Sequence, residues 1–131
     1  MAIHVYSTGP VENHKCFGKK YASKTVSIIV LNNSRRTIKF QVKTYGFKPN
    51  VNRKKLYESL SFTLKPHSKQ STFTDVSRFA VYEIQVVVHD NQKRDLKKND
   101  VLIGIFGKTE ADQFVASHRF VHSELTRLQS I

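Results

Sequence analysis

The stretch AVYEIQVVVHD at residues 80–90 decides the fold of this chain. One parity of the stretch is entirely apolar, and its members are Ala80, Tyr82, Ile84, Val86 and Val88. The opposite parity carries the polar residues Glu83, Gln85 and His89. Because successive side chains of a strand point to opposite faces, this alternation predicts a strand with one face in the core. Its β-branched residues fit a pleated, half-buried surface.

Five further stretches resemble strands in their apolar pattern. They are residues 25–31 (TVSIIVL), 37–47 (TIKFQVKTYGF), 56–64 (LYESLSFTL), 100–108 (DVLIGIFGK) and 113–121 (QFVASHRFV). A five-residue polar turn joins the first two, which predicts that they pair as an antiparallel hairpin. In the third, Leu60, Phe62 and Leu64 are expected to face the core. The fourth is apolar on both faces, which favours a central position, whereas the first fits either a central or an edge position.

The remaining segments have weaker patterns. Residues 3–6 fit a short edge strand, and residues 71–79 fit a polar connection with a short strand or turn at 72–74. The tail from 122 to 131 fits one helical turn. Because no long 3.6-residue period appears, the sequence predicts an all-β fold. We expect an antiparallel two-sheet sandwich of about seven strands, with a barrel as the alternative.

The length and composition indicate one globular domain. A chain of 131 residues with 39% hydrophobic residues buries enough surface to fold without covalent staples. Residues 1–24 are expected to form an N-terminal arm packed on a sandwich of residues 25–131. The single Cys16 excludes an intramolecular disulfide. No apolar segment has the length of a signal peptide core or a membrane span, so we expect a soluble, cytoplasmic protein, with export by another route left open.

Three segments resemble the immunoglobulin-like and fibronectin-like β-sandwich modules that are common in bacterial proteins. They are TVSIIVLNNS continuing into TIKFQVKTYGF, LSFTLKPHSKQSTFTDVS continuing into YEIQVVV, and VLIGIFGK with QFVASHRFV. The resemblance covers residues 25–121 and rests on strand spacing and turn chemistry. It implies an immunoglobulin-like sandwich, although the Cys pair and Trp of antibody domains are absent. Such folds host many functions, so the resemblance implies no particular activity.

The segment GIFGKT at residues 104–109 ends like a phosphate-binding loop. That loop requires G-x-x-x-x-G-K-[ST] followed by a helix, but the position five before Gly107 is Leu102. Because a turn and another strand follow, we expect no nucleotide site at this segment. Gly104 is expected to mark a bulge or a close backbone approach within its strand.

Residues with catalytic or metal-binding chemistry are dispersed along the chain. His118 and His122 lie four apart on one strand, which separates them by about 13 Å, too far to share a metal ion. His14 and Cys16 are two apart, but no second ligand pair at zinc spacing follows. The six histidines are therefore expected at surface or edge positions. No base is placed beside the Cys16 thiol by the sequence.

The acidic residues and the glycosylation motif at 32–34 give no stronger signal. The carboxylates are scattered, and no pair presents itself as a general acid and base. The motif Asn32-Asn33-Ser34 matters only in a secretory pathway, so we interpret it as a turn. We therefore predict no catalytic residue, no cofactor and no metal site, and we expect that the protein is not an enzyme.

Basic residues are the most informative polar feature. The chain has 22 Lys and Arg against 10 Asp and Glu, which gives a formal net charge of +12. This excess fits an anionic partner, or alternatively a general solvating surface. Polyanion-binding candidates lie on one predicted hairpin and in two loops: Arg35, Arg36, Lys39, Lys43, Arg53, Lys54, Lys55, Lys93, Arg94, Lys97 and Lys98. Tyr45, Phe47 and Tyr57 would add base stacking if they are exposed.

Three hypotheses follow from these observations. The first is a non-catalytic sandwich that acts as a structural or protein-interaction module, or that self-associates into an oligomer through a strand edge or apolar outer positions. The second is a domain that binds a polyanion, either nucleic acid or an anionic envelope polymer, through its basic hairpin and loops. The third, an enzyme whose site assembles around Cys16 or paired carboxylates, has the least support.

Overall fold

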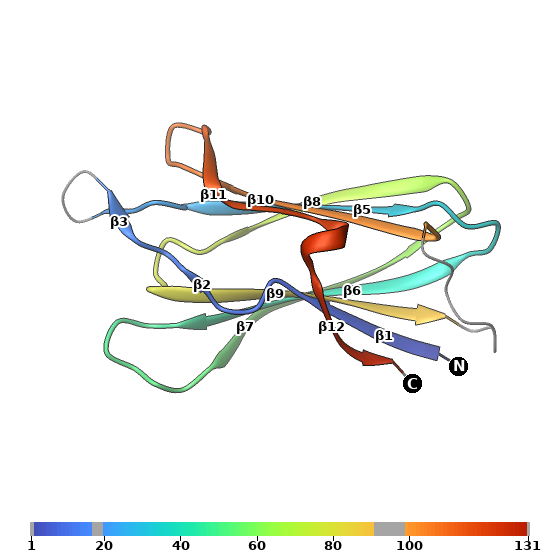
Figure 1. Ribbon diagram of the computed structural model, residues 1–131, viewed down its shortest axis with the longest axis horizontal. Helices are drawn as coiled ribbons and strands as arrows, with labels where there is room; N and C mark the ends of the chain where they lie inside the picture. Colours follow the sequence, from blue (N-terminus) through green and yellow to red (C-terminus); the bar gives the residue numbers. More distant parts are fainter. Residues whose placement is uncertain (1, 17–19, 91–98, 131) are drawn as a thin grey trace.

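The computed structural model describes residues 2–16, 20–90 and 99–130, and it is a sandwich of two antiparallel sheets (Figure 1). The large sheet has the order β12-β1-β9-β6-β7, with β2 beside β9. The small sheet has the order β11-β10-β5-β8. These findings confirm the predicted all-β class and the two-sheet architecture.

The strands of the large sheet are β1 (Ala2–Ser7), β2 (Val11–Glu12), β6 (Ile38–Phe47), β7 (Lys55–Leu64), β9 (Val81–Asp90) and β12 (Thr126–Ser130). The strands of the small sheet are β5 (Thr25–Asn32), β8 (Ser68–Asp75), β10 (Val101–Lys108) and β11 (Phe114–Val121). A separate two-stranded pair consists of β3 (Lys15–Cys16) and β4 (Lys20–Tyr21), and one 3₁₀ turn is η1 (His122–Glu124). Among the described residues, no helix is long and apolar enough to cross a membrane.

The core lies between the two sheets and is built from alternating residues of the central strands. On β9, the predicted inward residues Tyr82, Ile84, Val86 and Val88 are fully buried. They belong to one hydrophobic cluster together with inward residues of β5, β6 and β10: Val26, Ile28, Val30, Ile38, Phe40, Val42, Val101, Ile103 and Ile105. Each such side chain stabilises the fold by about 1.5–3 kcal/mol relative to an exposed position.

The small sheet confirms two expectations about strand position. β10 lies between β11 and β5, as its apolar pattern predicted, and it forms the expected hairpin with β11. β5, whose position the sequence left open, is also central, because it pairs with both β10 and β8.

The predicted hairpin between residues 25–31 and 37–47 is wrong. β5 and β6 lie in different sheets, and the intervening turn crosses from one sheet to the other. The buried Asn32 side chain fixes this crossing, because its amide donates hydrogen bonds to the backbone carbonyls of Arg36 and Leu64. The two strands therefore bury their apolar faces against each other across the core instead of pairing edge to edge.

β8 corrects the expectation of a polar connection at residues 71–79. It is an eight-residue strand that pairs with β5 along its whole length. The period was misleading because Thr74 is buried on the core side while Phe73 points outward. On β7, Leu64 is buried and Phe62 is half-buried as expected, but Leu60 is exposed, because only the last residues of this edge strand are covered.

The two ends of the chain also differ from expectation. β1 is not an edge strand, because β12 pairs with it on one side and β9 on the other. The tail forms η1 and then the strand β12, where a helical turn was expected at its end. A helix of five residues is unstable alone, whereas the free edge of β1 supplies backbone partners for a strand.

Candidate functional site

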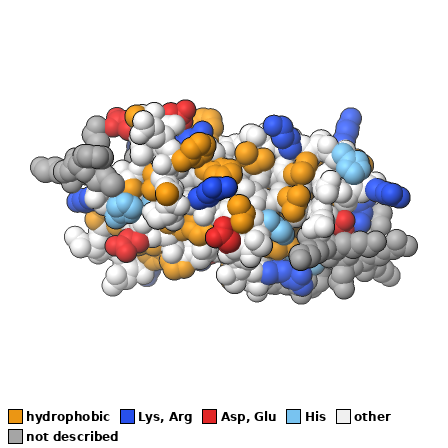
Figure 2. All heavy atoms as spheres, turned by 45° about the horizontal axis from the view of Figure 1, so that its top comes forward, with side chains coloured by type: hydrophobic (Ala, Val, Ile, Leu, Met, Phe, Trp, Pro, Cys, Tyr) orange, Lys and Arg blue, Asp and Glu red, His pale blue; other side chains and the backbone are white. Residues whose placement is uncertain are grey.

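The outer face of the small sheet carries the two large hydrophobic side chains with the highest exposed fractions in the described part of the chain. Register places Phe73 of β8, Ile29 and Leu31 of β5, Leu102 and Phe106 of β10, and Phe114 and Val121 of β11 on this face, which we call the apolar face. The two most exposed are Phe73 at 71% and Phe114 at 70%. Figure 2 turns this side toward the viewer and shows hydrophobic side chains gathered along it. Contiguous apolar surface of this kind marks an interaction site more often than isolated apolar residues do.

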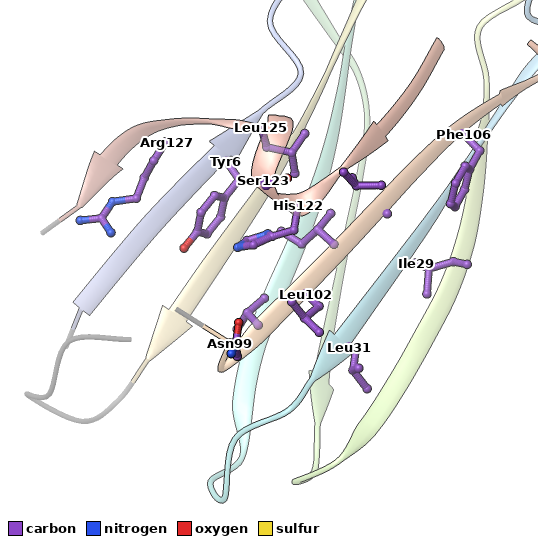
Figure 3. Close-up of a pocket in the computed structure, with 14 residues that line it drawn as sticks. Tyr6, Ile29, Leu31, Asn99, Leu102, Phe106, His122, Ser123, Leu125 and Arg127 are labelled. Carbon is purple, nitrogen blue, oxygen red and sulfur yellow. The ribbon is translucent and has the colours of Figure 1, made fainter. Parts of the chain in front are cut away.

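Two grooves lie on the apolar face. The larger groove has a volume of about 950 Å³ and runs from Leu31 and Leu102 toward η1 (Figure 3). Tyr6 and His122 form its other wall. A smaller groove of about 480 Å³ lies beside Phe73 and Phe114. Both grooves are lined by Ile29 and Phe106, so they adjoin at the middle of the sheet. Gly104 contributes to this relief, because a Cβ there would lie 3.2 Å from the Phe106 ring.

Basic side chains surround the apolar face. Register places Lys69 beside Leu31 and Arg119 beside Phe106, and Arg127 lines the larger groove. Lys108 lies over the Phe114 ring at 5.4 Å from its centroid and pairs with Asp112 at 3.6 Å. The carboxylate of Asp75 accepts hydrogen bonds from the backbone N–H and the hydroxyl of Ser77. Burial acts to raise the pKa of this carboxyl, but these hydrogen bonds and the charges of Lys24 and Arg78 together lower it. The acids near this face are thus engaged locally, and the rim is positively charged.

A third hollow, the basic pocket, lies where β6 ends and β7 begins. Its volume is about 790 Å³, and its lining includes the cations Lys48, Arg53, Lys54, Lys55 and Arg78. Apolar residues complete the wall: Val51, Leu56, Tyr57 and Phe79. No carboxylate belongs to the lining among the residues that the structure describes. Tyr57 is 44% exposed, and its ring contacts the buried Phe79 ring edge to face at 5.1 Å.

Lys54 differs from the other cations of the basic pocket, because it is held by Glu83. Its Nζ donates a 2.9 Å hydrogen bond to Glu83 Oε1 and lies 4.5 Å from the centroid of the Tyr45 ring. Glu83 also accepts hydrogen bonds from Ser7 and Gln85. Burial acts to raise the pKa of this carboxyl, but the three donors and the charge of Lys54 together lower it. Lys54 therefore serves the structure.

The structure separates the eleven basic candidates. Arg36 forms hydrogen bonds from Nε and Nη2 to the buried carboxylate of Asp90, which raises the pKa of its guanidinium. Arg35 and Arg36 precede β6, while Arg53, Lys54 and Lys55 follow it, so the two groups lie at opposite ends of a ten-residue strand. Lys39 and Lys43 lie between them on the outer face of β6. Burial is the largest cause that lowers the pKa of His89, and the charges of these two lysines lower it further. Lys93, Arg94, Lys97 and Lys98 lie outside the described residues.

A buried polar network joins a serine to a histidine. Ser23 Oγ lies 2.5 Å from His118 Nδ1, and His118 Nε2 lies 3.0 Å from the Glu12 carbonyl. Because that carbonyl needs a donor, Nε2 carries the proton and Nδ1 accepts from Ser23. Burial lowers the pKa of His118; the hydrogen bond to the Glu12 carbonyl acts to raise it, and neighbouring His14 acts to lower it. Both side chains are buried, and neither Ser23 nor His118 lines the hollows described above.

The structure bears on several smaller expectations from the sequence. His4 is buried on β1 inside the large sheet, so the histidines are not all at surface or edge positions. His118 is also buried, although its strand β11 is an edge strand. Gly104 is regularly paired, and the irregularity of β10 lies between Phe106 and Lys108 instead. The turn expected after Asn32 is present, and Ser34 bonds the Asn32 side chain there. Within the described part of the chain, no group of three or more His, Cys, Asp and Glu is arranged to hold a metal ion.

Part of each candidate surface does not follow from the sequence. Arg78 joins the basic pocket from the turn before β9, which no local pattern connects to the loop at Arg53. The sequence did not single out Phe73 and Phe114, because both lie among polar residues. Phe73 lies within the edge strand β8, and Phe114 is the first residue of the edge strand β11. Their signal was the placement of a large aromatic residue among outward positions, and it becomes visible only when the strand register is known.

The fold and these surfaces define a class of protein: a two-sheet, all-β sandwich with one apolar sheet face and one basic pocket. Comparisons of the chain with protein-family models, with curated proteins and with solved structures found no match.

Proposed function

We propose that the protein is a non-catalytic β-sandwich, with immunoglobulin-like strand connections, that binds another protein through its apolar face. The observation that supports this proposal most strongly is the exposure of Phe73 and Phe114 on one sheet face. Large apolar side chains that stay in water cost free energy, and covering them with a partner recovers about 25 cal/mol per Å². The two adjoining grooves offer places into which side chains of the partner would fit.

The charges around the apolar face favour an acidic protein as the occupant. Lys69, Arg119 and Arg127 surround it, and the nearest carboxylates already have partners within this chain. A second copy would bring another rim of the same sign and a second net charge of +12. Like charges at an interface suppress association, whereas an acidic rim speeds the encounter. We therefore assign the face to a different protein that presents apolar side chains within an acidic surface.

The size of the face sets an expected affinity. Four strands at about 4.8 Å spacing and eight residues at about 3.3 Å cover about 500 Å² of flat area. Specific interfaces bury about 800 Å² per partner, and smaller ones are transient. We therefore expect a micromolar, reversible complex that weakens moderately with salt because its rim is charged.

The test is site-specific photo-cross-linking in the native host. A photoreactive residue placed at Phe73 is expected to capture an acidic protein, and one placed at Ser61, on the outer face of the large sheet, is the matched control. The captured protein is then purified, and its affinity is measured for the native chain and for Phe73→Ser/Phe114→Ser. A loss of about ten-fold or more, equal to about 1.4 kcal/mol, supports the proposal. Equal capture at both positions, or equal affinity for both chains, would refute it.

A further inference from the structure

The basic pocket is independent of the apolar face, and its chemistry indicates a different kind of ligand. It is formed by the loop that joins β6 to β7 and by the turn before β9, at one end of the sandwich. Cations from two separate chain segments converge there: Lys48, Arg53 and Lys55 from the first, and Arg78 from the second. Converging charges of one sign raise the local concentration of an oppositely charged ligand.

The cations of this pocket remain available to a ligand. Within residues 2–16, 20–90 and 99–130, no ion pair is described for Lys48, Arg53 or Lys55. Arg78 shares its charge with Asp75, whose pKa it helps to lower. Lys54 forms an ion pair with Glu83, so we do not count it among the cations available to a ligand.

The apolar wall restricts the class of anion. Tyr57 is half-exposed and is held against the buried Phe79 ring, so its position is fixed by the core. Val51 and Leu56 extend the same wall. A bare inorganic anion would make no use of this surface, whereas a planar base stacks on an aromatic side chain in any sequence context.

We infer that the basic pocket binds a nucleotide unit, with its phosphate among Lys48, Arg53, Lys55 and Arg78 and its base against the wall that includes Tyr57. The unit is either a free nucleotide or one nucleotide of a single strand, because both offer the same phosphate and base. Arginine and lysine contacts to phosphate supply affinity without reading the base sequence. Binding is therefore expected to depend steeply on salt and weakly on sequence.

The experiment measures fluorescence anisotropy of a labelled single-stranded oligonucleotide of about ten nucleotides across a salt series, with AMP and inorganic phosphate as competitors. For a single strand, each phosphate that the pocket neutralises contributes about −0.7 to the slope of log K against log salt. The variant Arg53→Glu/Lys55→Glu is expected to weaken binding by about ten-fold or more. The matched control Arg35→Glu/Lys39→Glu makes the same charge change at the other end of β6 and is expected to weaken it only slightly.

The contribution of the apolar wall is tested by Tyr57→Ala beside Tyr57→Phe. Stacking predicts a loss of about five-fold or more for the alanine variant and near-native binding for the phenylalanine variant. Circular dichroism verifies that each variant folds. Tighter binding of the oligonucleotide than of AMP assigns a single strand, and similar binding assigns a free nucleotide.

Four results would overturn the inference. They are equal weakening by the two charge variants, competition by inorganic phosphate as strong as that by AMP, no binding of either nucleotide probe, and binding only to vesicles that contain an anionic phospholipid. None of them bears on the apolar face, which carries no residue of this pocket.

Discussion

Gly107 shows how one missing side chain keeps the buried polar network in place. A Cβ at this position would overlap the Oγ of Ser23 and the Cβ of His118, both of which are buried. We predict that Gly107→Ala lowers the free energy of unfolding by about 1–3 kcal/mol, the usual cost of overpacking. Urea unfolding measures the change. Gly104→Ala is the control, because its Cβ meets only the edge of a half-buried ring, and an equal loss in the two variants would contradict the explanation.

Asn32 is a second residue whose role is set by burial. Its amide donates to the carbonyls of Arg36, Leu64 and Lys65, and its carbonyl accepts from Ser34. Because removing it leaves buried carbonyls without donors, we predict that Asn32→Ala costs about 2–4 kcal/mol in the free energy of unfolding. Thermal denaturation of the exposed Asn33→Ala provides the comparison. A melting temperature equal to that of Asn32→Ala would show that the crossing does not depend on this side chain.

At the scale of elements, the crossing between β5 and β6 is also fastened to β9 by the Arg36–Asp90 pair. Arg36 donates from two nitrogens to a carboxylate that is fully buried, with a shortest distance of 2.6 Å. Lysine keeps the charge but not the planar fork of donors, so we predict that Arg36→Lys lowers the free energy of unfolding by about 1–2 kcal/mol. Chemical denaturation of this variant beside Arg35→Lys tests the claim. Identical midpoints would mean that charge alone is enough.

Elements with a regular apolar period were predictable from the sequence, and those whose pairing is non-local were not. β6, β9 and β10 match their expected spans closely because most of their inward residues are apolar, with buried Thr44 and Asp90 as exceptions near strand ends. β8 was not predicted as a full strand, because threonines face its core side. The β5–β6 pairing was misjudged because a five-residue turn fits both a hairpin and a sheet crossing, and the strands that compete for each edge decide between them.

At the scale of the whole molecule, histidines give the stability a pH dependence. Burial is the main cause that lowers the pKa of His118, His122 and His89 below the ordinary value of 6.5. The unfolded chain therefore binds protons before the folded one as the pH falls. Their stabilising contribution is complete above pH 6.5 and decreases as the pH falls toward the lower folded values.

This sign predicts that the free energy of unfolding decreases between about pH 7 and pH 5. Urea unfolding at a series of pH values measures the decrease. His118→Gln is expected to remove part of this slope, because it removes one of the three depressed groups. A stability that rises as the pH falls over this range would contradict the lowered pKa values of these three histidines.

The candidate surfaces were less predictable than the fold. The charge of the loop at Arg53–Lys55 indicated a polyanion site, but the contribution of Arg78 and the position of Tyr57 depend on tertiary structure. The expected grouping of Arg36 with a binding patch did not anticipate that Asp90 holds its guanidinium. Apolar outer positions were expected in general terms, and only register identified Phe73 and Phe114.

We propose that the apolar face is left open for a different protein and is not covered by a second copy. Sedimentation equilibrium of the isolated protein tests this most directly, at concentrations up to about 0.3 mM and about 0.15 M salt. We predict a monomer of 15.1 kDa over the whole range. A dimer that dissociates in the variant Phe73→Ser/Phe114→Ser would contradict it and would assign the face to self-association.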